Sequence, residues 1–384
     1  MQEVYLDNGA TSYPKAPGVG EAVKHFLDDI GSNVNRSGYA ASLAAEEIVF
    51  ETRERLCRLF NFGQPENVIF TLNVTQALNY LIKGLLQPGD HCIVSSMEHN
   101  AVMRPLMQLK KRGVEFSRLQ CDERGRLDPG DLYPLIKANT KAVIINHASN
   151  VCGTVLPVAE IGKICAERGL RFIVDTAQTA GILDIDFQKI RADALAFTGH
   201  KGLLGPQGTG GFLLSPELAR TLEPLISGGT GSLSEQEEPP PYLPDKFEAG
   251  TLNLPGIFGL HAALAYIEKT GTGAIRKKEL ELAALLLEGL SVIGEARLVG
   301  LEGLENRTAV VSVDFPGYDN AEIAYLLDRD YGIKTRCGLH CAPAAHKTLG
   351  TFPRGTVRLS PGHFNTREEI EYTLSSIHKV LKAL

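Results

Sequence analysis

Short apolar segments alternate with amphipathic segments between residues 68 and 214. Several apolar segments lack polar alternation, which is typical of strands that are covered on both faces of a sheet. The expected strands are residues 68–71, 92–95, 114–118, 142–146, 171–174, 194–197 and 211–214, and the expected helices are residues 75–86, 101–112, 129–137 and 158–168. This alternation of strands and helices predicts an α/β fold whose large domain has a mainly parallel seven-stranded sheet.

The pattern changes near residue 255. The expected helices there are residues 254–269, 275–290, 321–330 and 367–384, and the expected strands are 308–315, 333–336 and 357–359. An extended arm (residues 1–16) and two helices (18–30 and 43–60) precede the first strand. We expect a large domain at residues 15–255 and a smaller α+β domain from residues 1–14 and 256–384. The acidic, proline-rich segment 232–246 predicts a mobile surface loop, or a lid or partner-facing loop.

Composition narrows the class of protein. Of the 384 residues, 43% are hydrophobic, which is enough to form a substantial core. The net charge of −6 gives no indication of a basic surface that would bind nucleic acid. The first residues do not resemble a signal peptide, and no apolar run reaches the ~18 residues of a membrane span. We therefore expect a cytoplasmic protein without a membrane segment.

The seven cysteines are odd in number and mostly scattered in apolar segments, so inert buried thiols are the default expectation. Cys337 and Cys341 differ, because they share a short segment with His340 and His346.

A glycine-rich stretch around Lys201 follows the sixth expected strand. Six glycines lie within the thirteen residues 199–211. Glycine allows the backbone to approach a ligand closely, and a lysine in such a loop can form a Schiff base or bind phosphate. Taken alone, the stretch fits a solvated lysine in a turn better.

Other polar residues also follow expected strands, where ligands bind in open α/β sheets. Each has a binding role and a structural role open to it. Thr75 begins a helix, where it could bind an anion or only cap the helix. His99 could stack on a flat ring or relay a proton, or it could simply lie at the surface. Asn150 could hydrogen-bond a ligand oxygen or shape a turn. Asp175 could pair with a cationic group of a ligand or cap a helix. With Lys201, these groups match the needs of pyridoxal 5′-phosphate (PLP), whose ring nitrogen needs an acid.

The ordered motifs resemble the class V aminotransferase family of fold-type I PLP enzymes, nearest to its cysteine desulfurases and selenocysteine lyases. The resemblance extends over nearly the whole chain. It is carried by residues 5–11, 97–99, 147–154, 174–178, 198–201, 247–251 and 357–360.

The resemblance implies a role for each cofactor residue. Lys201 would bind PLP covalently, Asp175 would pair with the ring nitrogen, His99 would stack on the ring and donate a proton, and Gln178 would contact the ring hydroxyl. The remaining cofactor-binding residues would be Val74, Thr75, Thr198 and His200, with Thr251 contributed by the other subunit of a homodimer. The substrate would be bound by Asn150, by Arg358 at its carboxylate, and by Asn35 and Arg36.

Residues 336–342 resemble the Arg-x-Gly-x-His-Cys-Ala motif of group II desulfurases, which makes Cys341 the sulfur-accepting thiol. His340 is expected to favour the thiolate by placing positive charge beside it. Two alternatives stay open: an inert buried thiol, or a metal site formed by Cys337, His340, Cys341 and His346. The metal site does not fit the usual zinc spacing.

The activity that the resemblance implies is a PLP-dependent conversion of L-cysteine to L-alanine. Cys341 would become a persulfide and pass its sulfur to an acceptor protein, as in iron–sulfur cluster assembly. Alternatives are a selenocysteine lyase, which acts on L-selenocysteine, another class V aminotransferase, or a non-enzymatic sulfur or metal carrier.

Overall fold

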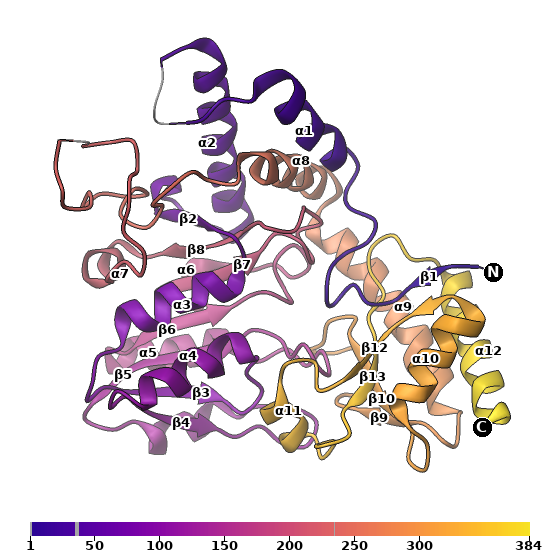
Figure 1. Ribbon diagram of the computed structural model, residues 1–384. Coiled ribbons are helices and arrows are strands. Elements are labelled where there is room, and N and C mark those ends of the chain that lie inside the picture. The colour runs from indigo at the N-terminus through magenta and orange to yellow at the C-terminus, as the bar shows by residue number, and fades with distance from the viewer. Residues whose placement is uncertain (1, 35–37, 234) are drawn as a thin grey trace.

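A mainly parallel sheet forms the centre of the protein (Figure 1), and it confirms the predicted fold class. The computed structural model describes residues 2–34, 38–233 and 235–384. Over these residues the sheet has seven strands in the order β2-β8-β7-β6-β5-β3-β4, of which β8 pairs antiparallel with its neighbours. The strands are β2 (Val68–Thr71), β3 (His91–Ser95), β4 (Glu115–Leu119), β5 (Thr140–Asn146), β6 (Arg171–Asp175), β7 (Ala194–Thr198) and β8 (Gly210–Leu214).

Alternate residues of each strand enter two hydrophobic cores, one on each face of the sheet. Along β5, Val143 and Ile145 pack into one core, whereas Ala142 and Ile144 pack into the other. The first core is covered by α1 (Val19–His25), α2 (Ala40–Phe60), α5 (Val158–Arg168), α6 (Phe187–Ile190) and α8 (Leu254–Thr270), and the second by α3 (Val74–Leu85), α4 (Asn100–Lys110) and α7 (Pro216–Thr221). Burial on both faces explains the unbroken apolar runs.

A third core lies in the C-terminal part of the chain. There a four-stranded antiparallel sheet has the order β12-β13-β10-β9, and helices pack against it. Its elements are α9 (Thr272–Ser291), β9 (Arg297–Val299), β10 (Val311–Asp314), α10 (Asn320–Tyr331), β12 (Arg336–Gly338), β13 (Thr356–Leu359) and α12 (Arg367–Ala383). The N-terminal strand β1 (Val4–Tyr5) pairs in parallel with β11 (Ile333–Lys334) beside this sheet.

Several local predictions differ from the structure. The strand expected at residues 333–336 is divided between β11 and β12, which lie in different sheets. The helix expected at residues 129–137 is a 3-10 helix, η3 (Pro129–Leu135), because Pro129 and Pro134 lack the amide hydrogens that an α-helix needs. The first helix ends in a π-helical turn, η1 (Phe26–Ile30). The short helix α11 (Pro343–Thr348) was not predicted, and neither were α6, α7 and β9.

The N-terminal arm connects the sheets at the point where the predicted site residues lie. Asp7 pairs with Arg358 of β13 at 2.6 Å, and the Ser12 amide donates to the His200 carbonyl at 2.8 Å. The arm therefore fixes the C-terminal sheet relative to the Lys201 loop. Among the described residues, every helix is too short or too polar to span a bilayer.

Candidate active site

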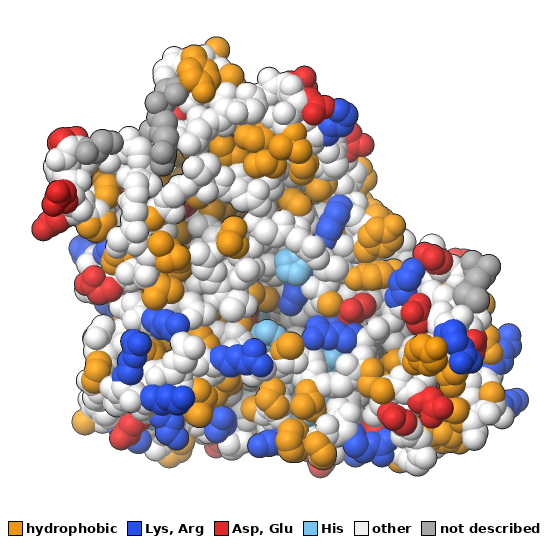
Figure 2. Space-filling view, viewed as in Figure 1, with side chains coloured by type: hydrophobic (Ala, Val, Ile, Leu, Met, Phe, Trp, Pro, Cys, Tyr) orange, Lys and Arg blue, Asp and Glu red, His pale blue; other side chains and the backbone are white. Residues whose placement is uncertain are grey.

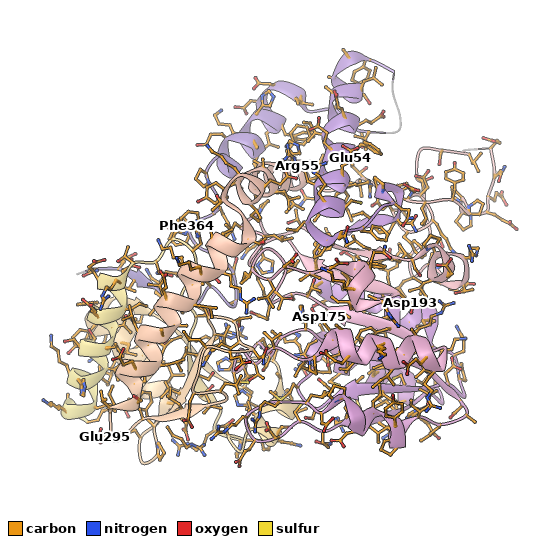
Figure 3. All side chains as sticks on the ribbon, turned by 180° about the vertical axis from the view of Figure 1, so that it is seen from behind. Glu54, Arg55, Asp175, Asp193, Glu295 and Phe364 are labelled. Carbon is orange, nitrogen blue, oxygen red and sulfur yellow. The ribbon has the colours of Figure 1, made fainter. Side chains whose placement is uncertain are left out.

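The carboxyl ends of β3, β5, β6 and β7 bring the candidate residues to one edge of the large sheet. Asn146 of β5 is in register with Asp175 of β6, and Asp175 is in register with Ala196 of β7. Figure 3 shows Asp175 in the middle of the molecule, where this edge meets the C-terminal part. The segments that carry His99, Asn150, Gln178 and Lys201 follow these strand ends.

Lys201 lines a cavity together with Gly9, Gln178 and Ser360. Its ammonium makes no hydrogen bond or ion pair with any residue that the structure describes. Burial lowers the pKa of Lys201 to about 8, an effect that Asp175 opposes and Arg358 reinforces. At pH 7 about a tenth of this lysine is therefore an uncharged amine, the form that acts as a nucleophile or a base, and the uncharged share rises to about half at pH 8.

The glycines beside Lys201 are required by close packing. A Cβ atom on Gly202 would lie 2.5 Å from the Ala180 carbonyl oxygen, and one on Gly205 would lie 3.0 Å from the Gly199 carbonyl oxygen. The loop therefore folds tightly against its neighbours and holds the lysine at a fixed position.

Asp175 is a buried acid with one unused oxygen. Its Oδ1 accepts a hydrogen bond from the Ala177 amide at 2.9 Å, and its other oxygen has no hydrogen-bond partner within the described residues. Burial raises the pKa of this carboxyl, while the Ala177 amide and Lys201 oppose the increase. A protonated ring nitrogen beside the free oxygen would stabilise the carboxylate.

His99 serves two purposes at the start of α4. Its Nδ1 accepts a hydrogen bond from the Ala101 amide at 3.0 Å and so caps the helix. Because Nδ1 is an acceptor, the proton of the neutral ring is on Nε2. Burial lowers the pKa of His99 to about 4, with contributions from Lys201 and Arg336. The ring is neutral at physiological pH.

The expected phosphate-binding residues lie at the ends of two strands. Val74 and Thr75 are the first residues of α3, and Thr75 is exposed. Thr198 is buried at the end of β7, and His200 has a buried Nδ1 atom without a partner in the described chain. Thr251 is exposed and lines a separate pocket with Thr71 and Gln76, among other residues of its own chain.

The two expected carboxylate-binding residues are in contact. Arg358 is fully buried in β13 and donates to Asp7 Oδ1 at 2.6 Å and to the Asn150 carbonyl at 3.0 Å. Asn150 Nδ2 donates to the His340 carbonyl at 2.7 Å. Arg358 Nε and Asn150 Oδ1 are buried without partners in the described chain. Asn35 and Arg36 lie outside the described residues.

Gln178 binds the N-terminal arm. Its Nε2 donates to the Gly9 carbonyl oxygen at 3.0 Å, and its side chain is buried. Gln178 therefore connects the cavity of Lys201 with the arm that carries Asp7.

Cys341 is exposed and lies close to the His99 segment. Its carbonyl oxygen accepts a hydrogen bond from the Asn100 amide at 2.8 Å, and its backbone has a left-handed φ of 58°. The Arg336 guanidinium donates a hydrogen bond to Cys341 Sγ at 3.5 Å. The thiol is thus accessible and has a cation beside it.

The expected role of His340 is wrong. Its side chain is buried, and its Nε2 is 3.0 Å from Thr356 Oγ1. Burial lowers the pKa of His340 to about 2, so the ring is neutral and supplies no positive charge. Arg336 supplies that charge instead. Within residues 2–34, 38–233 and 235–384, no three His, Cys, Asp or Glu side chains are arranged to hold a metal ion.

Three residues of the site were not predicted: Asp7, Glu98 and Arg336. Glu98 Oε1 accepts hydrogen bonds from Ser95 Oγ at 2.5 Å and from the Asn146 amide at 2.9 Å, while Oε2 is buried without a partner in the described chain. Burial raises the pKa of Glu98 to about 8. Asp7, Glu98 and Arg336 all lie inside motifs that carry the resemblance (residues 5–11, 97–99 and 336–342), and this is the signal that could have identified them.

Comparison with known proteins agrees with this arrangement. Residues 4–373 match the family model described as Aminotransferase class-V. The chain is 34% identical to a probable cysteine desulfurase from Methanothermobacter thermautotrophicus, over 98% of this chain and 94% of the relative. It is 34% identical to another from Pyrococcus abyssi, over 100% of this chain and 96% of the relative. An apo structure of a cysteine desulfurase from Thermococcus onnurineus NA1 has a TM-score of 0.93 and 34% identity, and the alignment covers 100% of this chain and 95% of that chain.

Proposed function

Because the chain belongs to the class-V aminotransferase family, we propose that it is a PLP-dependent cysteine desulfurase that converts L-cysteine to L-alanine. The observation that carries this proposal is the presence in one site of Lys201, a half-buried amine without a partner in the described chain, and of an exposed Cys341 thiol. Cys341 is held beside the His99 segment by the hydrogen bond from Asn100. A transaminase needs no such thiol.

The polar atoms around Lys201 fit the cofactor of this family. Lys201 would hold PLP covalently, the free oxygen of Asp175 would face the ring nitrogen, and His99 would lie against the ring. The phosphate would be held by Val74, Thr75, Thr198 and the unpartnered Nδ1 of His200. Bound PLP supplies an electron sink that makes the Cα proton of an amino acid acidic.

The chain's own residues then bind the substrate and move its protons. Arg358 would bind the substrate carboxylate through its unused Nε–H, and Asn150 through the second N–H of Nδ2, because the unused Asn150 Oδ1 can only accept a hydrogen bond. Lys201 Nζ would accept the Cα proton, which suits an amine with a pKa of about 8. His99 Nε2 holds the proton that would complete the methyl group of alanine.

Cys341 would take the sulfur. Its thiolate attacks the substrate sulfur, an S–S bond forms, and the C–S bond breaks with its electron pair left on carbon. The hydrogen bond from Arg336 supports a negatively charged Sγ. The persulfide would then pass its outer sulfur to an acceptor protein, and the enzyme would act as a homodimer.

Substitution of Cys341 tests the proposal. Cys341→Ala should keep the visible absorbance of the bound cofactor but lose alanine formation by at least about a hundredfold, since the sulfur-accepting nucleophile is absent. Lys201→Ala should lose both the absorbance of the lysine-bound cofactor and turnover.

The matched control is Cys337→Ala, which removes a half-buried thiol of β12 and should leave turnover unchanged. The measurements are an absorption spectrum and the amount of alanine formed from L-cysteine with a small-thiol reductant. Alanine formation by Cys341→Ala at the rate of the unmodified enzyme would contradict the assignment.

A further inference from the structure

A groove beside Cys341 is lined by three cations and by no carboxylate. One wall is α4 and the other is α11, while Ser96 and the end of β4 form the floor. We call it the basic groove. Its lining residues are Ser96, Asn100, Met103, Arg104, Met107, Arg118, Gln120, Pro343, Ala344, Lys347 and Thr348.

The cations of the basic groove are available for a partner. Arg104, Arg118 and Lys347 are exposed, and none of them forms an ion pair with any residue that the structure describes. Arg118 lies over the Phe116 ring at 5.2 Å and Lys347 over the Phe352 ring at 4.9 Å, contacts that leave their charges uncompensated. Figure 2 shows Lys and Arg side chains gathered over this region, although the whole chain carries a net charge of −6.

The basic groove is continuous with the proposed sulfur-accepting thiol. Asn100 lines the groove, and its amide donates the hydrogen bond to the Cys341 carbonyl. Pro343, two residues after Cys341, begins the opposite wall. A molecule in the groove therefore lies next to Cys341.

We propose that the basic groove docks the sulfur-acceptor protein through an acidic segment next to the acceptor's own thiol. This inference rests on the proposed desulfurase function. Unpaired cations attract a segment of opposite charge and raise its association rate. Met107, which is 47% exposed, supplies an adaptable apolar contact beside these cations.

The sulfur transfer in this complex needs no oxidant. The acceptor thiolate attacks the outer sulfur of the Cys341 persulfide and forms a new S–S bond. The S–S bond to Cys341 Sγ breaks and leaves its electron pair there. The acceptor gains one sulfur as a persulfide, and Cys341 returns to the thiolate.

Two synthetic peptides test the proposal with the holoenzyme and L-cysteine. Each carries a single cysteine, flanked by glutamates in one peptide and by lysines in the other. Transfer is measured as peptide persulfide by mass spectrometry. We expect at least about tenfold faster transfer to the glutamate peptide at low salt, and a smaller preference at high salt.

The groove variant is Arg118→Glu with Lys347→Glu. Arg104 is left intact because its charge contributes to the electrostatics of His99. The matched control is Lys163→Glu with Lys277→Glu, which makes the same charge change on exposed lysines of α5 and α9. The groove variant should lose the preference and the control should keep it, while both form alanine with dithiothreitol at the rate of the unmodified enzyme.

Equal transfer to both peptides by the unmodified enzyme, or an equal preference in the groove variant and its control, would overturn the docking proposal. Alanine formation with dithiothreitol separates this result from a failure of the function itself. If the unmodified enzyme forms no alanine with dithiothreitol, the desulfurase proposal fails, and the docking proposal fails with it.

Discussion

Several buried polar atoms around Lys201 have no partner in the described chain, and they indicate where a ligand would bind. They are Asn150 Oδ1, His200 Nδ1 and Arg358 Nε. Folded proteins satisfy nearly all of their buried polar groups, so unpaired ones require an explanation. A phosphate beside His200 Nδ1 and an amino acid carboxylate beside Arg358 Nε would provide two of the missing partners, whereas Asn150 Oδ1 is an acceptor and requires a donor from the ligand.

The protonation of the buried Glu98 carboxyl makes the stability of the protein depend on pH. Its pKa is about 8 in the folded protein, against a reference value of 4.5. Between these values the folded protein holds a proton that the unfolded chain has lost, so the free energy of unfolding falls as the pH rises through this range. Glu98→Gln resembles the protonated side chain and removes this dependence. Between pH 6 and pH 8 the free energy of unfolding of the unmodified protein should fall by about 2 kcal/mol more than that of the Glu98→Gln variant.

The measurement is urea denaturation of the holoenzyme at both pH values. Glu281→Gln, an exposed position on α9, is the matched control and should keep the pH dependence of the unmodified protein. An identical dependence in Glu98→Gln and in the unmodified protein would mean that Glu98 is ionised in the fold.

At the scale of elements, α4 begins with a residue that has two separable functions. His99 caps the helix through Nδ1 and faces the proposed chemistry through Nε2. His99→Asn should keep a capping oxygen, whereas His99→Ala should lose it and cost about 1 kcal/mol more in stability. Both should lose alanine formation by about a hundredfold, because neither side chain can donate the proton. Urea denaturation and an alanine assay measure the two effects, and equal stability of the two variants would disprove the capping role.

Most strands of the large sheet could be predicted from the sequence because both of their faces are buried and their apolar runs are unbroken. The edge strand β4 is largely exposed and interrupted by polar residues, so its position followed only from the alternation of strands and helices. Polar residues after the strands gave Asp175 and Lys201. The two-residue strand β1 and the three-residue strand β9 are too short to show a pattern. The helix α11, which forms a wall of the basic groove, is only six residues long.

At the scale of the whole molecule, the site combines parts of the chain that no local pattern connects. Asp7 and Arg358 are 351 residues apart, and their ion pair forms only because the N-terminal arm packs beside the C-terminal sheet. Nothing in the sequence around either residue indicates that the two form an ion pair. The ordered motifs identified Arg358 through a resemblance, but its partner became evident only in the structure.

The proposed dimer raises the question of which subunit Thr251 serves. Thr251 is exposed and shares a pocket with Gln76 of its own chain, next to Thr75. Leu72 and Ile226, which also line this pocket, are 56% and 45% exposed. Exposed apolar side chains around a polar pocket fit a surface that a second copy covers. We therefore expect Thr251 to complete the partner's site.

Mixed dimers of two inactive variants can decide this. Lys201→Ala and Thr251→Asp each inactivate a homodimer, the second because its carboxylate repels the phosphate. If Thr251 serves the other subunit, a mixed dimer has one site with both changes and one intact site. Random mixing makes half of the dimers mixed, so about a quarter of the alanine-forming activity should return. If Thr251 serves its own subunit, each site of the mixed dimer carries one inactivating change, and co-expression should restore no activity.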